Sequence, residues 1–163
     1  MSSSRRATLG ALLAGVLCLS GCATPSRQLT PEAAFWAGRI AVQIQSQPAQ
    51  SLSAAFELQG SATQGELQLL SPIGSTLAQL NWTSETAKLS QDAREWSGAS
   101  LDELMTQLTG TPLPMAALFD WLAGHATAPP GWQVDLSQWA KGRIQAERQS
   151  PAPAVQLKVV LER

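Results

Sequence analysis

The sequence contains few of the residues that carry chemistry. Its 163 residues include two cysteines, one histidine and no tyrosine, and only 14% of them are charged. The cysteines, Cys18 and Cys22, both lie near the start of the chain, which excludes a disulfide-rich scaffold. The 11 basic and 12 acidic residues give no basic excess, so we expect no nucleic-acid partner. A hydrophobic share of 44% is ample for one folded domain.

The common signatures of enzymes and metal sites are also missing. The sequence has neither the Gly-x-Ser-x-Gly turn of serine hydrolases nor the Gly-x-x-x-x-Gly-Lys-Ser/Thr loop of nucleotide hydrolases. His125 is the one histidine, and it falls near the end of a predicted helix, where a cation is favourable. Asp102 and Glu103 are adjacent, so they point apart on a helix and form no acid pair. We therefore expect no enzyme activity, no metal and no cofactor.

Residues 1–21 have the pattern of a bacterial signal peptide. Arg5 and Arg6 precede an uncharged apolar run, which is short for the roughly 20 residues of a spanning helix. The run ends in Leu-Ser-Gly-Cys at 19–22, which resembles the lipobox in which a cysteine is acylated and becomes the new N-terminus. We expect Cys22 to carry lipid; an ordinary cleavable signal that happens to contain a cysteine is the alternative.

Cleavage before Cys22 would leave 142 of the 163 residues, with 9 basic and 12 acidic side chains. No basic patch is apparent, so the acyl chains would hold the protein to the membrane, at about 0.8 kcal/mol per buried CH₂. Residue 23 is alanine rather than the aspartate associated with inner-membrane retention in enteric bacteria. We expect an outer-membrane protein that faces the periplasm, with residues 22–34 as a tether.

The next part of the chain alternates between apolar and polar residues. Ile40, Val42 and Ile44 share one face of a predicted strand, with glutamine and alanine on the other. Period-two alternation of this kind is typical of antiparallel strands with one solvated face. The same pattern predicts strands near 36–44, 52–58, 67–69, 78–82, 86–91, 94–97, 132–136, 142–148 and 155–161.

Two helices interrupt the strands. Ser100 and Glu103 form a Ser-x-x-Glu capping box, and Gly110 is a suitable end for the helix that follows. A second apolar stripe predicts a helix from about Pro114 to about Gly124. Residues 35–163 therefore predict one mainly β domain of the α+β class, a curved antiparallel sheet with two helices on its apolar face.

The turn between two of these strands carries an unusual residue. Pro72 and Gly74 suit a tight reversal, but Ile73 between them is apolar and β-branched. One interpretation is that Ile73 folds back onto the sheet. The other is that it forms an apolar finger that touches lipid or a partner.

Several segments together resemble the LolB family of outer-membrane lipoprotein receptors, and their order and spacing cover most of residues 36–161. Besides the lipobox, they are Phe-Glu-Leu-Gln-Gly at 56–60, Leu-Leu-Ser-Pro-Ile-Gly-Ser-Thr at 69–76, Leu-Asn-Trp at 80–82, Leu-Thr-Gly-Thr-Pro-Leu-Pro at 108–114, Leu-Phe-Asp-Trp-Leu-Ala-Gly at 118–124 and Gly-Trp-Gln-Val at 131–134.

The resemblance implies an open, incomplete β-barrel whose helices cover an apolar cavity. It also implies a protein that receives lipoproteins from the periplasmic carrier LolA and inserts them into outer-membrane lipid. Because the sequence has no nucleotide-binding loop, we expect this transfer to proceed without nucleotide hydrolysis. We also expect a monomer. On this resemblance, Pro72, Ile73 and Gly74 correspond to the protruding apolar loop of the family.

The residues that we expect to face the acyl chains are large apolar side chains on the predicted sheet and helices. For each of them, an ordinary place in a packed core is the alternative. A rival function is a non-catalytic envelope lipoprotein that binds another hydrophobic ligand or scaffolds outer-membrane assembly, with its sheet face packed. The candidates are Ile40, Val42, Phe56, Leu80, Trp82, Met105, Leu108, Met115, Leu118, Phe119 and Leu122.

Overall fold

The computed structural model describes residues 34–162. The expected signal peptide, the lipidation site Cys22 and the tether up to residue 33 lie outside the described residues. Ala34, at the end of the expected tether, is the first residue of strand β1.

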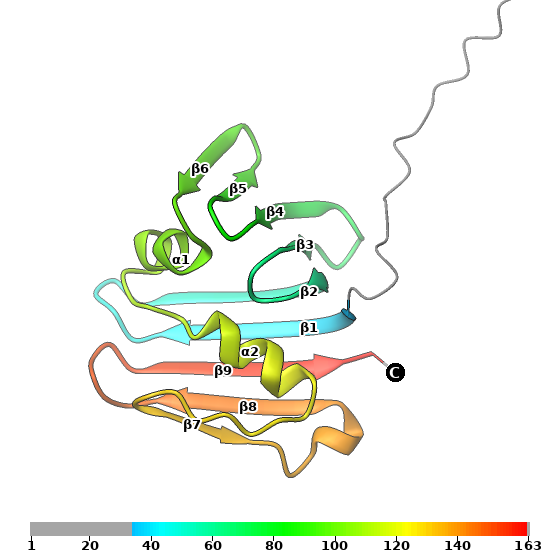
Figure 1. The fold of residues 1–163 in the computed structure, drawn as a ribbon, viewed down its shortest axis with the longest axis vertical. Helices are drawn as coiled ribbons and strands as arrows, with labels where there is room; N and C mark the ends of the chain where they lie inside the picture. Colours follow the sequence, from blue (N-terminus) through cyan, green and yellow to red (C-terminus); the bar gives the residue numbers. More distant parts are fainter. Residues whose placement is uncertain (1–33, 163) are drawn as a thin grey trace, which may run out of the picture.

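The described chain forms one nine-stranded antiparallel sheet and two α-helices (Figure 1). The sheet order is β6-β5-β4-β3-β2-β1-β9-β8-β7, so neighbouring strands are consecutive in sequence except where β9 pairs with β1. The strands are β1 (Ala34–Ile44), β2 (Gln50–Gly60), β3 (Gly65–Leu70), β4 (Thr76–Trp82), β5 (Ala87–Gln91), β6 (Arg94–Gly98), β7 (Trp132–Asp135), β8 (Arg143–Arg148) and β9 (Val155–Leu161).

The sheet curves but does not close. Strands β6 and β7 are its two edges, and they do not pair with each other. In the middle, β1 and β9 approach very closely at Gly38, where a Cβ atom would lie 2.1 Å from the carbonyl oxygen of Val160. The expected fold class, an open and incomplete β-barrel, is confirmed.

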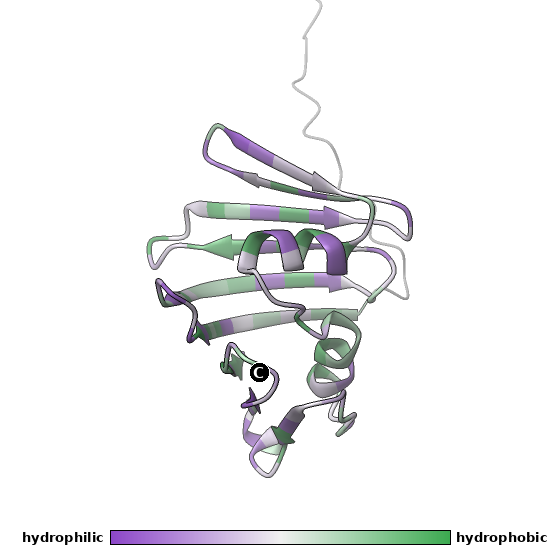
Figure 2. Cartoon of the chain, turned by 90° about the vertical axis from the view of Figure 1, so that its left-hand side faces the viewer, coloured by the Kyte–Doolittle hydropathy of each residue, from purple (hydrophilic) through white to green (hydrophobic). Residues whose placement is uncertain are grey.

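The two helices connect β6 to β7 and lie over the concave face of the sheet (Figures 1 and 2). Helix α1 (Leu101–Thr109) begins with the predicted cap, because the Ser100 hydroxyl oxygen accepts the backbone N–H of Glu103 at 3.1 Å. It ends at Gly110, whose φ of 71° is the left-handed conformation that glycine adopts readily. Helix α2 (Met115–Leu122) follows after a short linker, and a single turn of 3₁₀ helix (Trp139–Lys141) precedes β8.

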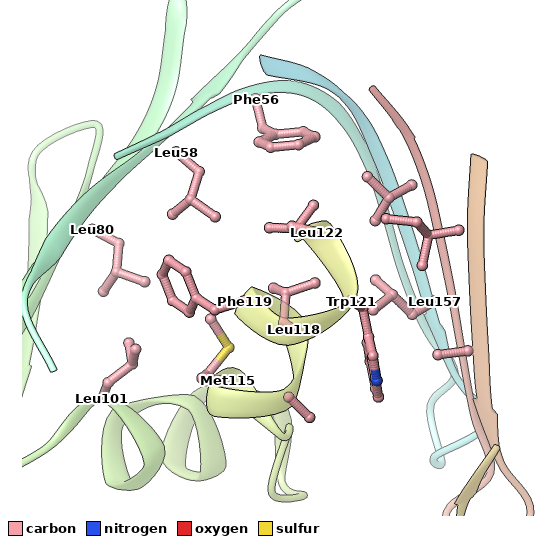
Figure 3. Packing of buried hydrophobic residues seen from close by; sticks show 14 of the residues in the cluster. Phe56, Leu58, Leu80, Leu101, Met115, Leu118, Phe119, Trp121, Leu122 and Leu157 are labelled. Carbon is pink, nitrogen blue, oxygen red and sulfur yellow. The ribbon is translucent and has the colours of Figure 1, made fainter. Parts of the chain in front are cut away.

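Alternation along the strands determines the position of the core. In β2 the buried residues are Ala54, Phe56 and Leu58, with more exposed residues between them, as the period-two pattern predicts. Figure 3 shows the Phe56 and Leu58 side chains pointing from the sheet toward α2, which lies within the curve of the strands. The hydrophobic face of α2 is thus enclosed by the sheet, and Trp121 on this helix is fully buried.

Candidate functional site: an apolar cavity under the helices

A cavity of about 470 Å³ lies between the concave face of the sheet and the two helices. Its wall is built from alternate residues of the strands and from the sheet-facing sides of α1 and α2. Most of the lining is hydrocarbon, with polar side chains only at Gln50, Ser51, Gln91 and Thr109. The apolar lining residues are Ile40, Val42, Ile44, Leu52, Leu67, Leu69, Leu77, Ala78, Leu80, Leu89, Met105, Leu108, Leu113, Pro114, Met115, Leu118, Trp121, Trp132, Val155 and Leu157.

Seven of the eleven cavity candidates chosen from the sequence lie on this wall. They come from three different parts of the fold, namely the central strand β1, strand β4 and the two helices. The seven residues are Ile40, Val42, Leu80, Met105, Leu108, Met115 and Leu118.

The other four candidates, Phe56, Trp82, Phe119 and Leu122, lie in the packed core and not on the cavity wall. Phe119 explains the difference, because its ring packs against the ring of Trp82 at a centroid distance of 6.1 Å. The ring of Trp36 also meets Phe119, edge to face at 5.7 Å. Helix α2 therefore packs directly against this part of the sheet through the Phe119 ring.

Two tryptophans on the wall were not among the sequence candidates. Trp121 lies on the side of α2 that is turned toward Leu157 in Figure 3, and its indole N–H donates to the carbonyl of Thr127 at 2.7 Å. The ring of Trp132 lies 5.8 Å from that of Trp121. Alternation in the last strand marks Val155 and Leu157 as inward residues, but the sequence gives no sign that the tryptophans lie beside them.

The cavity opens where several strands begin or end. Gln50, Ser51 and Leu52 lie at the start of β2, Leu77 at the start of β4 and Gln91 at the end of β5. Leu52 and Leu77 face the core side of the sheet at this opening but remain 42% and 41% exposed. A long apolar ligand could therefore enter here and meet apolar side chains throughout.

A firm turn presents Ile73 beyond this end of the sheet. The Ser71 and Ser75 backbones bond across the turn at 2.8 Å, and the backbone N–H of Gly74 donates to the Ser71 carbonyl at 2.9 Å. Gly74 takes the positive φ of 81° that the reversal requires. Ile73 is 89% exposed, so the interpretation in which it folds back onto the sheet is wrong.

A buried cation lies close to the cavity. Arg148, at the end of β8, is 3% exposed, and its guanidinium donates to the Thr111 hydroxyl, to the Pro112 carbonyl at 3.3 Å and to the Pro153 carbonyl at 3.1 Å. Its Cζ lies 5.7 Å from the ring centre of Trp132. Within residues 34–162 its hydrogen-bond acceptors are all neutral, and its Nε has no partner. Arg148 thus ties the α1–α2 linker and the β8–β9 loop to the sheet.

The side chains that line the cavity carry no charge. Between residues 34 and 162, His, Cys, Asp and Glu side chains do not gather in the groups of three that could hold a metal ion. Hydrogen bonds from the side chain and backbone of Ser137 lower the pKa of Asp135, which lies outside the cavity. Neither described helix has the length and apolar character to cross a membrane.

Comparisons with known proteins agree with this geometry. A sequence model described as "Outer membrane lipoprotein LolB" matches residues 35–158. A protein of Cupriavidus metallidurans named outer-membrane lipoprotein LolB is 32% identical over 158 residues, which cover 92% of this chain and 76% of the relative. Proteins of the same name from Ralstonia nicotianae and Shewanella baltica are 31% and 26% identical; they cover 87% and 78% of this chain, and 73% of each relative is covered.

Proposed function

The chain belongs to the LolB family of outer-membrane lipoproteins, whose role is in lipoprotein localisation. From this premise we propose that it accepts lipoproteins from the periplasmic carrier LolA, shelters their acyl chains in the cavity and inserts them into the outer membrane. In this proposal the protein works as a monomer.

The observation that carries the proposal is an apolar cavity of about 470 Å³ that is open at one end. Acyl chains cannot cross the aqueous periplasm unshielded, since each exposed methylene costs about 0.8 kcal/mol relative to an apolar environment. Burial of about ten methylenes would supply about 8 kcal/mol, which corresponds to a micromolar dissociation constant before the cost of association is subtracted.

The transfer would run downhill from carrier to receptor to bilayer. A ligand moves between two sites only if it binds one of them more tightly, so the receptor must bind acyl chains better than the carrier does. Met105 and Met115 on the wall support a cavity that adapts to different chains, because methionine side chains are flexible and polarisable.

Acylation of Cys22 would keep the receptor at the membrane into which it delivers. The sulfur would then carry the lipid, and the tether at residues 22–33 would connect the described domain to the membrane. A Cys22→Ala variant should lose the acyl modification and leave the membrane fraction while keeping its fold. Mass spectrometry of the variant checks this, and acylation that persisted would contradict the assignment.

The Pro72-Ile73-Gly74 tip would enter the bilayer during delivery. Its exposed apolar side chain supports this role, and its turn keeps that side chain away from the sheet. Contact with the lipid would bring the cavity opening close to the membrane, so that the acyl chains have a short path to their final place.

A displacement experiment tests the proposal directly. The purified protein is loaded with a fluorescent fatty acid and titrated with an acylated lipoprotein; the matched control is the same lipoprotein without its acyl chains. We expect the acylated form to displace the probe and the control to leave it bound. A protein that did not bind the probe, or that released it equally to both competitors, would refute an acyl-chain cavity.

A further inference from the structure

The loops around the cavity opening share a property that the cavity itself does not require. Four of them contain no ionisable residue: the β1–β2 turn at 45–49, the β3–β4 loop at 71–75, the α1–α2 linker at 110–114 and the β8–β9 loop at 149–154. We name these four segments the mouth loops. Their side chains are serine, threonine, glutamine, proline, alanine, glycine, leucine and isoleucine.

The fold brings the mouth loops to the same end of the sheet. In an antiparallel meander, alternate connections lie at the same end, and the register Ile44↔Gln50 and Leu70↔Thr76 places the first two there. The β8–β9 loop joins them, since the backbone N–H of Gln45 donates to the Ala154 carbonyl at 2.9 Å. Arg148 binds the linker and the β8–β9 loop together.

The absence of charge extends well into the flanking elements. Residues 40–56, 67–84, 104–119 and 149–157 contain no Asp, Glu, Lys, Arg or His. The remaining turn at this end, between β5 and β6, carries one charge of each sign in Asp92 and Arg94. At the opposite end the β2–β3 turn at 61–64 is also uncharged, while Glu85 lies in the β4–β5 turn, Lys141 precedes β8 and Glu162 follows β9.

We propose that the mouth loops form a docking surface for the bilayer, on which the open end of the cavity lies flat against the lipid headgroups. This rests on the proposed function and extends it from one inserted residue to the orientation of the whole domain. Bringing the mouth loops into the headgroup layer dehydrates no ionised group, whereas burial of even one unpaired charge is costly. A protein partner recognised through charge complementarity would need charged loops at this place.

The continuity of apolar surface supports lipid as the occupant. Ile73 in a mouth loop is 89% exposed, and Leu52 and Leu77, which immediately border the opening, are partly exposed. From them the apolar surface continues into the cavity without a charged side chain. With the mouth loops on the bilayer, an acyl chain would slide from the cavity into the lipid without crossing water.

The first arm of the test measures contact in the full-length, anchored protein reconstituted in vesicles of zwitterionic phospholipid. Single substitutions Ala49→Cys and Ala152→Cys place a fluorescent label on two mouth loops, and Ser84→Cys places it at the opposite end as the control. The geometry predicts that lipid shields the first two labels from aqueous iodide at low and at high salt. Equal quenching at all three positions, or shielding that needs anionic lipid and disappears in salt, would overturn the proposal.

The second arm adds charge without changing shape. Gln47→Glu combined with Gln149→Glu places two carboxylates on the mouth loops, while Gln64→Glu, in the β2–β3 turn at the opposite end, is the isosteric control. In the double variant we expect the ratio of docked to undocked protein to fall about tenfold, which corresponds to about 1.4 kcal/mol. The control should match the wild type. If the mouth-loop labels stayed shielded from iodide in the double variant, the docking surface would be refuted.

The two arms separate this proposal from the proposed function. If the mouth-loop labels were fully quenched while the wild type still delivered lipoprotein, the docking surface would be wrong and the receptor function would stand. If the labels were shielded but no lipoprotein bound, the docking surface would stand and the receptor function would be wrong.

Discussion

At the scale of single residues, Ile73 is a side chain whose exposed position is not needed for folding. Gly74 carries the positive φ of the turn and hydrogen bonds within Ser71–Ser75 hold it, so the turn does not need an apolar side chain at position 73. An isoleucine side chain that is 89% exposed buries almost no apolar surface, so it adds little to the stability of the fold in water. The proposed contact with lipid would give this side chain a role.

The Ile73→Glu variant should therefore keep the stability of the wild type but lose delivery. We expect an unchanged thermal midpoint and at least a tenfold slower insertion of bound lipoprotein into vesicles, of the order expected when a charge must enter lipid. The rate is measured as labelled lipoprotein recovered with the vesicles. Ile73→Leu is the control and should insert normally; insertion by the glutamate variant at the wild-type rate would show that the finger is dispensable.

Arg148 has the opposite character, since it is buried and acts on structure. Its guanidinium bonds to Thr111, Pro112 and Pro153 hold the linker that carries cavity residue Leu113. In Arg148→Met the stem is kept but these bonds are lost, and we expect a loss of about 1–3 kcal/mol in the free energy of unfolding. Hydrogen exchange at residues 110–113 should accelerate as well. Unchanged exchange in the linker would mean that Arg148 does not hold it.

At the scale of elements, the cavity exists because α2 lies close to one part of the sheet and away from another. Phe119 fills the space toward β4, whereas Leu118 and Met115 border the open region. Each region contains one buried alanine: Ala78 on β4 lines the cavity, and Ala117 on α2 lies in the packed core.

We therefore expect opposite results from the same substitution at these two positions. Ala78→Phe should fill the cavity, weaken binding of a fluorescent fatty acid at least tenfold and leave the stability close to that of the wild type. Ala117→Phe, the matched control, should overpack the core and cost about 1–3 kcal/mol. Fatty-acid titration and chemical denaturation check both. Full probe affinity in Ala78→Phe would place the lipid elsewhere.

The order and boundaries of the elements follow well from local patterns. The alternation at 40–44 and 52–58 and the capping box at Ser100 each correspond to an observed element, because each pattern depends on neighbours in sequence. The ladder between β1 and β9 is different. It joins the first and last strands of the domain, and neither this pairing nor the close approach at Gly38 has a local signature in the sequence.

Membership of the cavity wall follows from the sequence only in part. Period two identifies the inward face of a strand, and it correctly placed Ile40, Val42 and Leu80 on that face. It cannot tell which inward residues α2 will cover, since this depends on how far the helix stands from each strand. Phe56 and Trp82 therefore look like wall residues in the sequence but are packed in the structure.

At the scale of the whole molecule, the positions of the charges and of the cavity opening distinguish the two ends of the domain. The four mouth loops at the open end are uncharged and include Ile73, although the β5–β6 turn beside them carries Asp92 and Arg94. Glu85, Lys141 and Glu162 lie at the other end. A domain with this polarity suits the boundary between water and lipid, where one end must stay hydrated and the other must release an apolar cargo.

We propose that this protein takes acyl chains from a carrier that binds them more weakly, without an energy source. The most direct measurement follows a labelled lipoprotein bound to the periplasmic carrier after the purified protein is added in equal amount and without nucleotide. We expect most of the label to move to this protein and then, when vesicles are added, into the lipid. A label that remained on the carrier would contradict it.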